Sequence, residues 1–180
     1  MKNLLMVIPL VFLLCFTFAC QDKEAMAEFE AMKAQAAVEE QNIELIKGLL
    51  EELNKGNAEI WKELCSPEFA YYAPSDSPKP MSMEKTIECF QMAFEGFPDI
   101  NWKIHDLIAK GDIVIARLIQ TGSHEGEYRG IPATGNKIKI GIISIFQIKD
   151  GKCIEIREEY DGLGFMQQLG FELKPKEAEE

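Results

Sequence analysis

Apolar residues recur along this chain with two different spacings, one helical and one extended. Between residues 43 and 53 they fall three or four positions apart, which predicts an amphipathic helix. From about residue 100 onward the pattern predicts strands at about 100–109 and 112–121, and two more on either side of residue 150. Helices that precede a run of strands predict an α+β domain, in which about three N-terminal helices pack on one face of a curved antiparallel sheet.

Shorter elements connect the first helix to the strands. Residues 58–64 favour a brief helix and residues 69–72 a brief strand, and a proline-rich loop follows at 73–80. Ser82 is placed to cap a further helix that runs through Glu95. These elements supply the remaining helical layer of the predicted domain.

The last strand carries an unusual charge. The segment from Lys149 to Lys152 contains Asp-Gly, the pair that a tight hairpin turn favours. In the strand after it, Ile154, Ile156, Glu158 and Tyr160 share one face by alternation. Burial of an unpaired carboxylate is costly, so an acidic residue on an apolar face is either paired or functional. Glu158 is therefore the leading candidate for a catalytic group.

Arg117 is a second charge on an apolar strand. It shares a face with Ile113, Ile115 and Ile119, and the opposite face is apolar too. An arginine in such a place needs a carboxylate partner or a ligand anion. We expect Glu158 to be that partner if both residues line the interior of the domain; a structural ion pair at the rim is the equal alternative.

Several motifs in the second half of the chain occur together in one known family. They are G-x-P-x-T-G at Gly130–Gly135, D-G-K at Asp150–Lys152 and D-x-x-G-x-x-Q-Q-L-G at Asp161–Gly170. With them, the chain resembles the SnoaL-like polyketide cyclases over about residues 40–170. That family belongs to the nuclear transport factor 2-like superfamily, which includes ketosteroid isomerase. The resemblance implies a cone-shaped domain.

The same resemblance implies roles for individual residues. Glu158 stands where the cyclases carry their general base, which takes a proton from a carbon next to carbonyl groups and starts an aldol closure. Ser144 stands at the position of the cyclase's pocket histidine; a serine can hydrogen-bond a substrate oxygen but cannot hold a proton near pH 7. The related chemistry uses neither a metal nor an organic cofactor, so we expect none.

The ligand expected from this resemblance is a small apolar or carbonyl-containing molecule. The candidate substrate-binding residues are Arg117, Ser144, Tyr72 and Tyr160. Tyr160 belongs to the set because it shares the face of Glu158. Tyr71 and Tyr72 point to opposite faces of their strand, and the alternation alone does not decide which one enters the cavity. We assign Tyr72 to the candidate set.

Residues 1–20 read as a targeting segment. Leu4–Phe18 is almost wholly apolar, is short for a membrane span, and runs through Ala19 and Cys20 into polar sequence. This form predicts export. It resembles a bacterial lipoprotein signal, in which Cys20 becomes the acylated first residue and holds the protein at the cell envelope by lipid alone. An uncleaved anchor, or cleavage without acylation, is the alternative.

The rest of the chain divides into three segments. Residues 21–38 predict a helical or flexible tether, residues 39–172 the folded domain, and residues 173–180 a charged tail. The formal net charge of −11 disfavours nucleic acid and an anionic membrane surface as partners of the folded body.

Histidine and cysteine do not indicate a metal site. His105 and His124 lack the spacing of a zinc motif, and each is expected at the surface or at the edge of the core. Beyond the leader, Cys65, Cys89 and Cys153 form neither a C-x-x-C pair nor a disulfide framework, so we expect buried free thiols.

Three functions remain open at this point. The domain is an enzyme of the cyclase or isomerase type, a binder of a small apolar ligand at the cell envelope, or an assembly module. The superfamily commonly dimerises through the outer surface of its sheet. Glu155, Arg157 and Glu159 lie on the charged face of the last strand, where opposite charges can pair across a two-fold axis. We therefore expect a homodimer.

Overall fold

The computed structural model describes residues 4–172 and 174, with side chains from residue 23 onward. The chain divides into two compact units, Met1–Val38 and Glu39–Glu180. Helix α1 spans Leu4–Leu53, so residues 21–38 are helical. No helix in the described part of the chain is long and apolar enough to cross a membrane. The side chain of Cys20 and, apart from Lys174, the charged tail lie outside the described residues.

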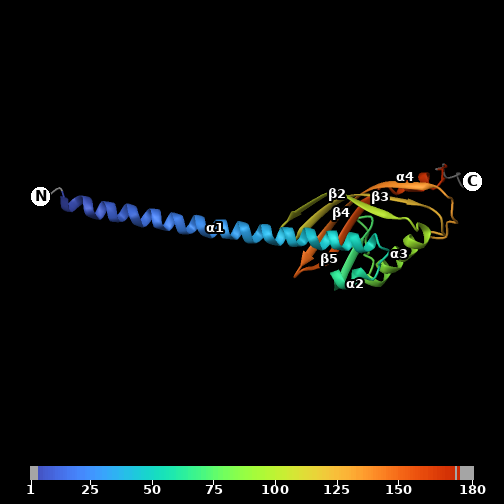
Figure 1. Ribbon diagram of the computed structural model, residues 1–180, viewed down its shortest axis with the longest axis horizontal. Coiled ribbons are helices and arrows are strands. Elements are labelled where there is room, and N and C mark those ends of the chain that lie inside the picture. Colours follow the sequence, from blue (N-terminus) through green and yellow to red (C-terminus); the bar gives the residue numbers. More distant parts are fainter. Residues whose placement is uncertain (1–3, 173, 175–180) are drawn as a thin grey trace, which may run out of the picture. The chain divides into compact units, whose positions relative to one another are not determined.

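The second unit contains the remaining helices and all the described strands (Figure 1). After the end of α1 the chain forms two short helical segments and five strands, with a longer helix between the first strand and the second. The elements are α2 (Ile60–Leu64), β1 (Cys65–Tyr72), α3 (Met83–Gly96), β2 (Asn101–Lys110), β3 (Ile113–Ser123), β4 (Lys137–Lys149), β5 (Lys152–Tyr160) and α4 (Gly162–Gln168). The predicted α+β class is confirmed.

The strands form one sheet in the order β1-β5-β4-β3-β2. Strands β2 to β5 make the predicted antiparallel meander, whereas β1 runs parallel to β5. The expectation of a purely antiparallel sheet was therefore wrong at this edge. A hairpin forces antiparallel pairing, but β1 is separated from β5 by α3 and three strands, and its direction is free of that constraint.

The C-terminal part of α1 belongs to the core of the second unit. Its apolar stripe, Ile46, Leu49, Leu50 and Leu53, is buried as the spacing predicts. Two hydrogen bonds also hold this helix to the β2–β3 turn. The Asn42 side chain donates to the Gly111 carbonyl at 2.9 Å, and the Gly111 amide donates to Glu39 Oε1 at 2.8 Å. Gly111 has φ +60°, a conformation that glycine adopts without strain.

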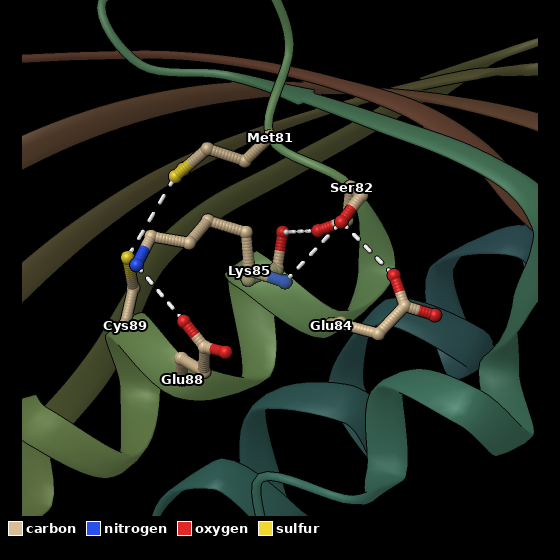
Figure 2. A network of polar contacts seen from close by, with 7 residues as sticks. Met81, Ser82, Glu84, Lys85, Glu88 and Cys89 are labelled. Atoms are coloured by element: carbon tan, nitrogen blue, oxygen red, sulfur yellow. Dashed lines mark hydrogen bonds and ion pairs between the residues drawn. The ribbon is translucent and has the colours of Figure 1, made fainter.

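Helix α3 begins at the predicted cap (Figure 2). Ser82 Oγ accepts from the Lys85 amide at 3.3 Å and donates to Glu84 Oε2 at 2.9 Å. One face of the helix then meets the segment before it, where Cys89 Sγ lies 3.7 Å from Met81 Sδ. The cap thus fixes the start of a helix whose next two turns carry residues of the cavity described below.

A β-bulge interrupts the alternation of β5. Gln147 pairs with Glu155, but Ile148 pairs with Cys153, so β5 has one extra residue at this point. As a result Cys153 and Ile156 are both buried, while Ile154 is partly exposed. The prediction that Ile154 faces inward was wrong, because simple alternation cannot anticipate the extra residue. Beyond the bulge, Glu158 recovers the predicted face.

Candidate active site

A cavity of about 140 Å³ lies between α3 and the inner face of the sheet. One cross-strand row, Trp102 on β2, Gln120 on β3 and Ile140 on β4, forms part of its wall. Phe90 and Ala93 of α3 face this row, and most of the lining is aromatic or aliphatic. The polar groups among the lining residues come from Tyr71, Cys89, Gln120, Tyr128, Arg129, Glu158 and Tyr160. A mostly apolar cavity with a few polar groups is the usual form of a small-molecule site.

Glu158 enters this cavity from β5. It pairs across the sheet with Ser144 of β4, and Ser144 Oγ donates to Glu158 Oε2 at 2.9 Å. The serine is 1% exposed, so the predicted position of Ser144 on the inner face is confirmed. Tyr71, from β1, also hydrogen-bonds the carboxylate. Two hydroxyls therefore orient the carboxylate toward the cavity.

The environment of Glu158 favours its protonated form. Burial raises the pKa of Glu158, and the hydrogen bonds from Tyr71 and Ser144 only partly oppose that effect. A small recess also borders the carboxylate, and most of its lining is apolar, with Leu49, Leu50 and Phe146 among the residues. Burial, followed by the charge of Glu158, also raises the pKa of Tyr71 well above its ordinary value, so this phenol stays a donor. A carboxylate with a raised pKa is a stronger base than one in water.

Arg117 does not meet Glu158, and that prediction was wrong. Its Nη2 lies 2.5 Å from Asp106 Oδ2, and the side chain is 44% exposed on the outer face of the sheet. Ala116 and Leu118, its neighbours on β3, are buried instead. Both faces of β3 are apolar in sequence, and the helices cover only one of them. The hydrogen bond from Arg117 lowers the pKa of Asp106, as expected of a surface ion pair.

The structure also reverses the choice between the two adjacent tyrosines. Tyr71 is 5% exposed and lines the cavity. Tyr72 lies on the other side of β1, where the Arg157 guanidinium carbon is 4.2 Å from the centre of its ring. Tyr72 is therefore not a cavity residue. Tyr160 does line the cavity, and its role in binding stays a prediction.

Gln120, Tyr128 and Arg129 are cavity residues that the sequence did not single out. Tyr128 and Arg129 precede Gly130, the first residue of the G-x-P-x-T-G motif, in a loop between β3 and β4. Loop residues carry no alternation signal, and Gln120 lies on a strand whose inner face was misassigned. The G-x-P-x-T-G motif was the one sequence feature that could have indicated that this loop contributes to the cavity.

His124 anchors that loop. It is fully buried, stacks on Phe97 at 4.9 Å between ring centres, and accepts from the Thr134 amide through Nδ1 at 3.3 Å. The expectation of a surface or core-edge position was wrong for His124; His105 is at the surface, with its side chain 54% exposed. Within the described residues, no three His, Cys, Asp or Glu side chains are grouped as metal ligands would be.

Comparison with known proteins gives a consistent result. The family model of the SnoaL-like polyketide cyclases matches residues 44–169. TsrD from Streptomyces laurentii is 28% identical, with 72% of this chain and 95% of that chain covered and a TM-score of 0.63. A candidate SnoaL-like polyketide cyclase from Jannaschia sp. CCS1 is 27% identical, with 73% and 93% covered and a TM-score of 0.66.

A third solved structure extends the pattern. IdmH, a candidate polyketide cyclase from Streptomyces antibioticus, is 27% identical, with 73% of this chain and 99% of that chain covered and a TM-score of 0.63. No curated protein matches the chain. The family match begins at residue 44, within α1, and ends at residue 169.

Proposed function

Because the chain belongs to the SnoaL-like polyketide cyclase family, we propose that it catalyses a cyclase- or isomerase-type reaction in which Glu158 acts as general base on a small carbonyl compound. One observation carries this proposal. The Glu158 carboxylate faces an apolar cavity, is oriented by Ser144 and Tyr71, and has a pKa raised by burial. Those are the properties that a base needs to remove a proton from carbon near neutral pH.

Glu158 alone can carry the proton through either reaction. Glu158 takes a proton from the carbon next to a carbonyl, and the electron pair of the broken C–H bond moves to the carbonyl oxygen as an enolate. In a cyclisation the enolate carbon forms a bond to a second carbonyl carbon of the same molecule. The π bond of that second carbonyl breaks, and its oxygen takes the proton back from Glu158 and becomes a hydroxyl group. In an isomerisation the proton returns to another carbon. In both, Glu158 ends the cycle as a carboxylate.

A developing enolate oxygen needs hydrogen-bond donors. Ser144 was one expected donor, but its hydroxyl hydrogen is directed to Glu158, and Arg117 lies on the outer face. We assign this role to the Gln120 amide and the Tyr160 hydroxyl, which line the same cavity. The amide N–H and the phenol O–H are both hydrogen-bond donors, so they can stabilise negative charge on the enolate oxygen.

Hydrogen–deuterium exchange tests the proposal without knowledge of the natural substrate. The probe is 2-tetralone, a compact apolar ketone, and NMR follows deuterium entry at the carbons beside the carbonyl. We expect the protein to accelerate exchange, and Glu158→Gln to lower the acceleration by about 10²–10⁴-fold. Glu159→Gln is the matched control, because Glu159 is the next residue on β5 and is exposed. Binding of 2-tetralone without accelerated exchange would favour the non-catalytic binder.

Two further proposals concern where and how the domain works. We propose that the leader exports the chain and that Cys20 carries the lipid anchor, as the form of residues 1–20 suggests.

We also propose a homodimer through the outer face of the sheet. That face carries five large exposed apolar side chains, Ile108, Ile113, Ile115, Ile143 and Ile145. Ile115 and Ile145 are direct cross-strand partners, so these side chains form one patch rather than scattered positions.

A further inference from the structure

Arg129 is the one lysine or arginine among the described residues that line the main cavity. The residue is exposed, whereas Glu158, which lines the same cavity, is largely buried. The cavity therefore has a cation at its solvent-facing end and a carboxylate deeper inside.

The other two arginines of the chain have carboxylate partners. Arg117 pairs with Asp106 at 2.5 Å and Arg157 with Glu155 at 2.7 Å. Among the described residues no carboxylate oxygen lies within 4.0 Å of Arg129. In a chain with a net charge of −11, acidic groups are abundant, so an arginine that faces a cavity without one is free to bind a ligand anion.

Neutral and aromatic groups surround the Arg129 side chain instead. Its guanidinium carbon lies 5.3 Å from the centre of the Tyr128 ring, a cation–π contact. Burial acts to lower the pKa of Arg129, but the neighbouring Tyr128, Tyr160 and Cys89 groups outweigh that effect and raise it. The Arg129 guanidinium therefore keeps its positive charge. The Tyr128 ring contacts the guanidinium but does not cancel that charge.

The backbone keeps Arg129 on the cavity wall. Tyr128 and Ile131 exchange two backbone hydrogen bonds of 2.9 Å, which close a tight turn around Arg129 and Gly130. Arg129 has φ 50°, a left-handed conformation that L-residues other than asparagine and aspartate seldom adopt. A residue held in such a conformation by its surroundings is a frequent feature of binding sites.

We propose that Arg129 binds the anionic end of the ligand, so that the ligand class is a compact apolar monocarboxylate whose carbonyl group reaches toward Glu158. The placement of the carbonyl rests on the proposed function; the carboxylate contact does not. A single cation, opposite a carboxylate and in a strongly acidic chain, fits a monoanion better than the doubly charged phosphate of a phosphate ester. The apolar residues that line the cavity, which include Phe90 and Phe165, can contact the hydrocarbon body of such an acid.

A matched pair of probes tests this inference. 2-Naphthoate and 2-naphthamide have the same bicyclic body, and only the first is an anion at neutral pH. We expect calorimetry to show that the wild-type protein binds 2-naphthoate about tenfold or more tightly than 2-naphthamide. The affinity for 2-naphthoate should fall as salt is raised, because the contact lies at the exposed end of the cavity.

Substitutions test whether Arg129 is the residue that makes the protein prefer 2-naphthoate over 2-naphthamide. Arg129→Gln should weaken 2-naphthoate binding by roughly 10- to 100-fold, the effect expected for a hydrogen bond to a charged group, and leave 2-naphthamide binding within about twofold. Arg129→Lys should retain part of the preference, because a lysine keeps the charge and loses the planar fork. Arg117→Gln is the control arginine on the outer face, and it should change neither affinity.

Three results would overturn the inference: equal affinity for the two probes, an equal loss of both in Arg129→Gln, or no binding of either at millimolar concentration. The outcome is separable from the fate of the proposed reaction. If 2-tetralone exchange is absent while the naphthoate preference disappears with Arg129→Gln, the anion site stands and the base does not. If exchange depends on Glu158 but the two probes bind alike, the base stands and the anion site does not.

Discussion

Ser144 donates a 2.9 Å hydrogen bond to the carboxylate of Glu158 across the β4–β5 ladder. This bond lowers the pKa of Glu158, in opposition to the larger effect of burial. Ser144, which the resemblance aligns with a pocket histidine of the polyketide cyclases, thus contacts the proposed base through a neutral hydroxyl. The serine adjusts how readily Glu158 ionises, which gives it a measurable role.

Ser144→Ala should shift the pH dependence of 2-tetralone exchange to higher pH. The substitution removes a hydrogen bond that favours the ionised carboxylate, so the pKa of Glu158 rises further and a higher pH is needed to form the base. The measurement is the midpoint of the pH–rate profile. A midpoint that stays in place would show that the Ser144 contact does not reach the reacting carboxylate.

Glu158→Gln should stabilise the folded protein at pH 8 relative to wild type. Burial raises the pKa of Glu158 in the folded state, so the unfolded carboxyl ionises first as pH rises above its ordinary value of about 4.3. Wild type therefore loses stability through that range, up to the folded pKa, and the glutamine variant does not. Below about pH 4 the two should unfold with the same free energy. Urea titrations at both pH values provide the test, and a less stable variant at pH 8 would contradict the sign.

Arg117→Met should change the free energy of unfolding by at most about 1 kcal/mol. Its ion pair with Asp106 is half-exposed on the outer face, and solvent screens such pairs strongly. Had Arg117 balanced a buried Glu158, the loss would have been about 3–5 kcal/mol. Thermal or urea unfolding of the variant beside wild type distinguishes the two magnitudes. The double change with Glu158→Gln should show additive effects, because the two residues share no contact.

Ile145→Glu should convert the proposed dimer into a monomer. The side chain is 42% exposed and lies beside Ile115 on the outer sheet face, so two like charges would meet near a two-fold axis. Light scattering gives the mass directly. Leu163→Glu on α4, at an exposed apolar position away from that face, is the control and should keep the dimer. A monomeric mass for the wild-type protein would refute the proposed interface.

Cys20→Ser should release the protein from the membrane fraction into the soluble envelope fraction if acylation at Cys20 anchors it. The apolar leader would still direct export, and only the lipid would be lost. Detergent extraction followed by fractionation measures the change. Membrane association that persists in the serine variant would point to an uncleaved N-terminal anchor.

The sequence by itself determined most of the framework. Helical spacing placed the buried stripe of α1, Ser82 marked the start of α3, and Asp-Gly marked the β4–β5 turn. Alternation also placed Glu158 on the inward face of its strand, and the family resemblance placed Ser144 in the pocket. The family motifs led to the correct fold, including elements whose periodicity is weak.

Tertiary structure decided what alternation leaves ambiguous. On β3 both faces are apolar, so only the packing of the helices on one of them excludes Arg117 from the cavity. Tyr71 rather than Tyr72 enters the cavity because β1 pairs with the edge of β5 in a particular register. One extra residue in β5 places Cys153 in the core. Arg129 reaches the cavity from a loop that buried contacts of His124 hold in place. That loop has no alternating or helical pattern from which its path could be predicted. These choices are set by contacts between distant segments, which local periodicity does not encode.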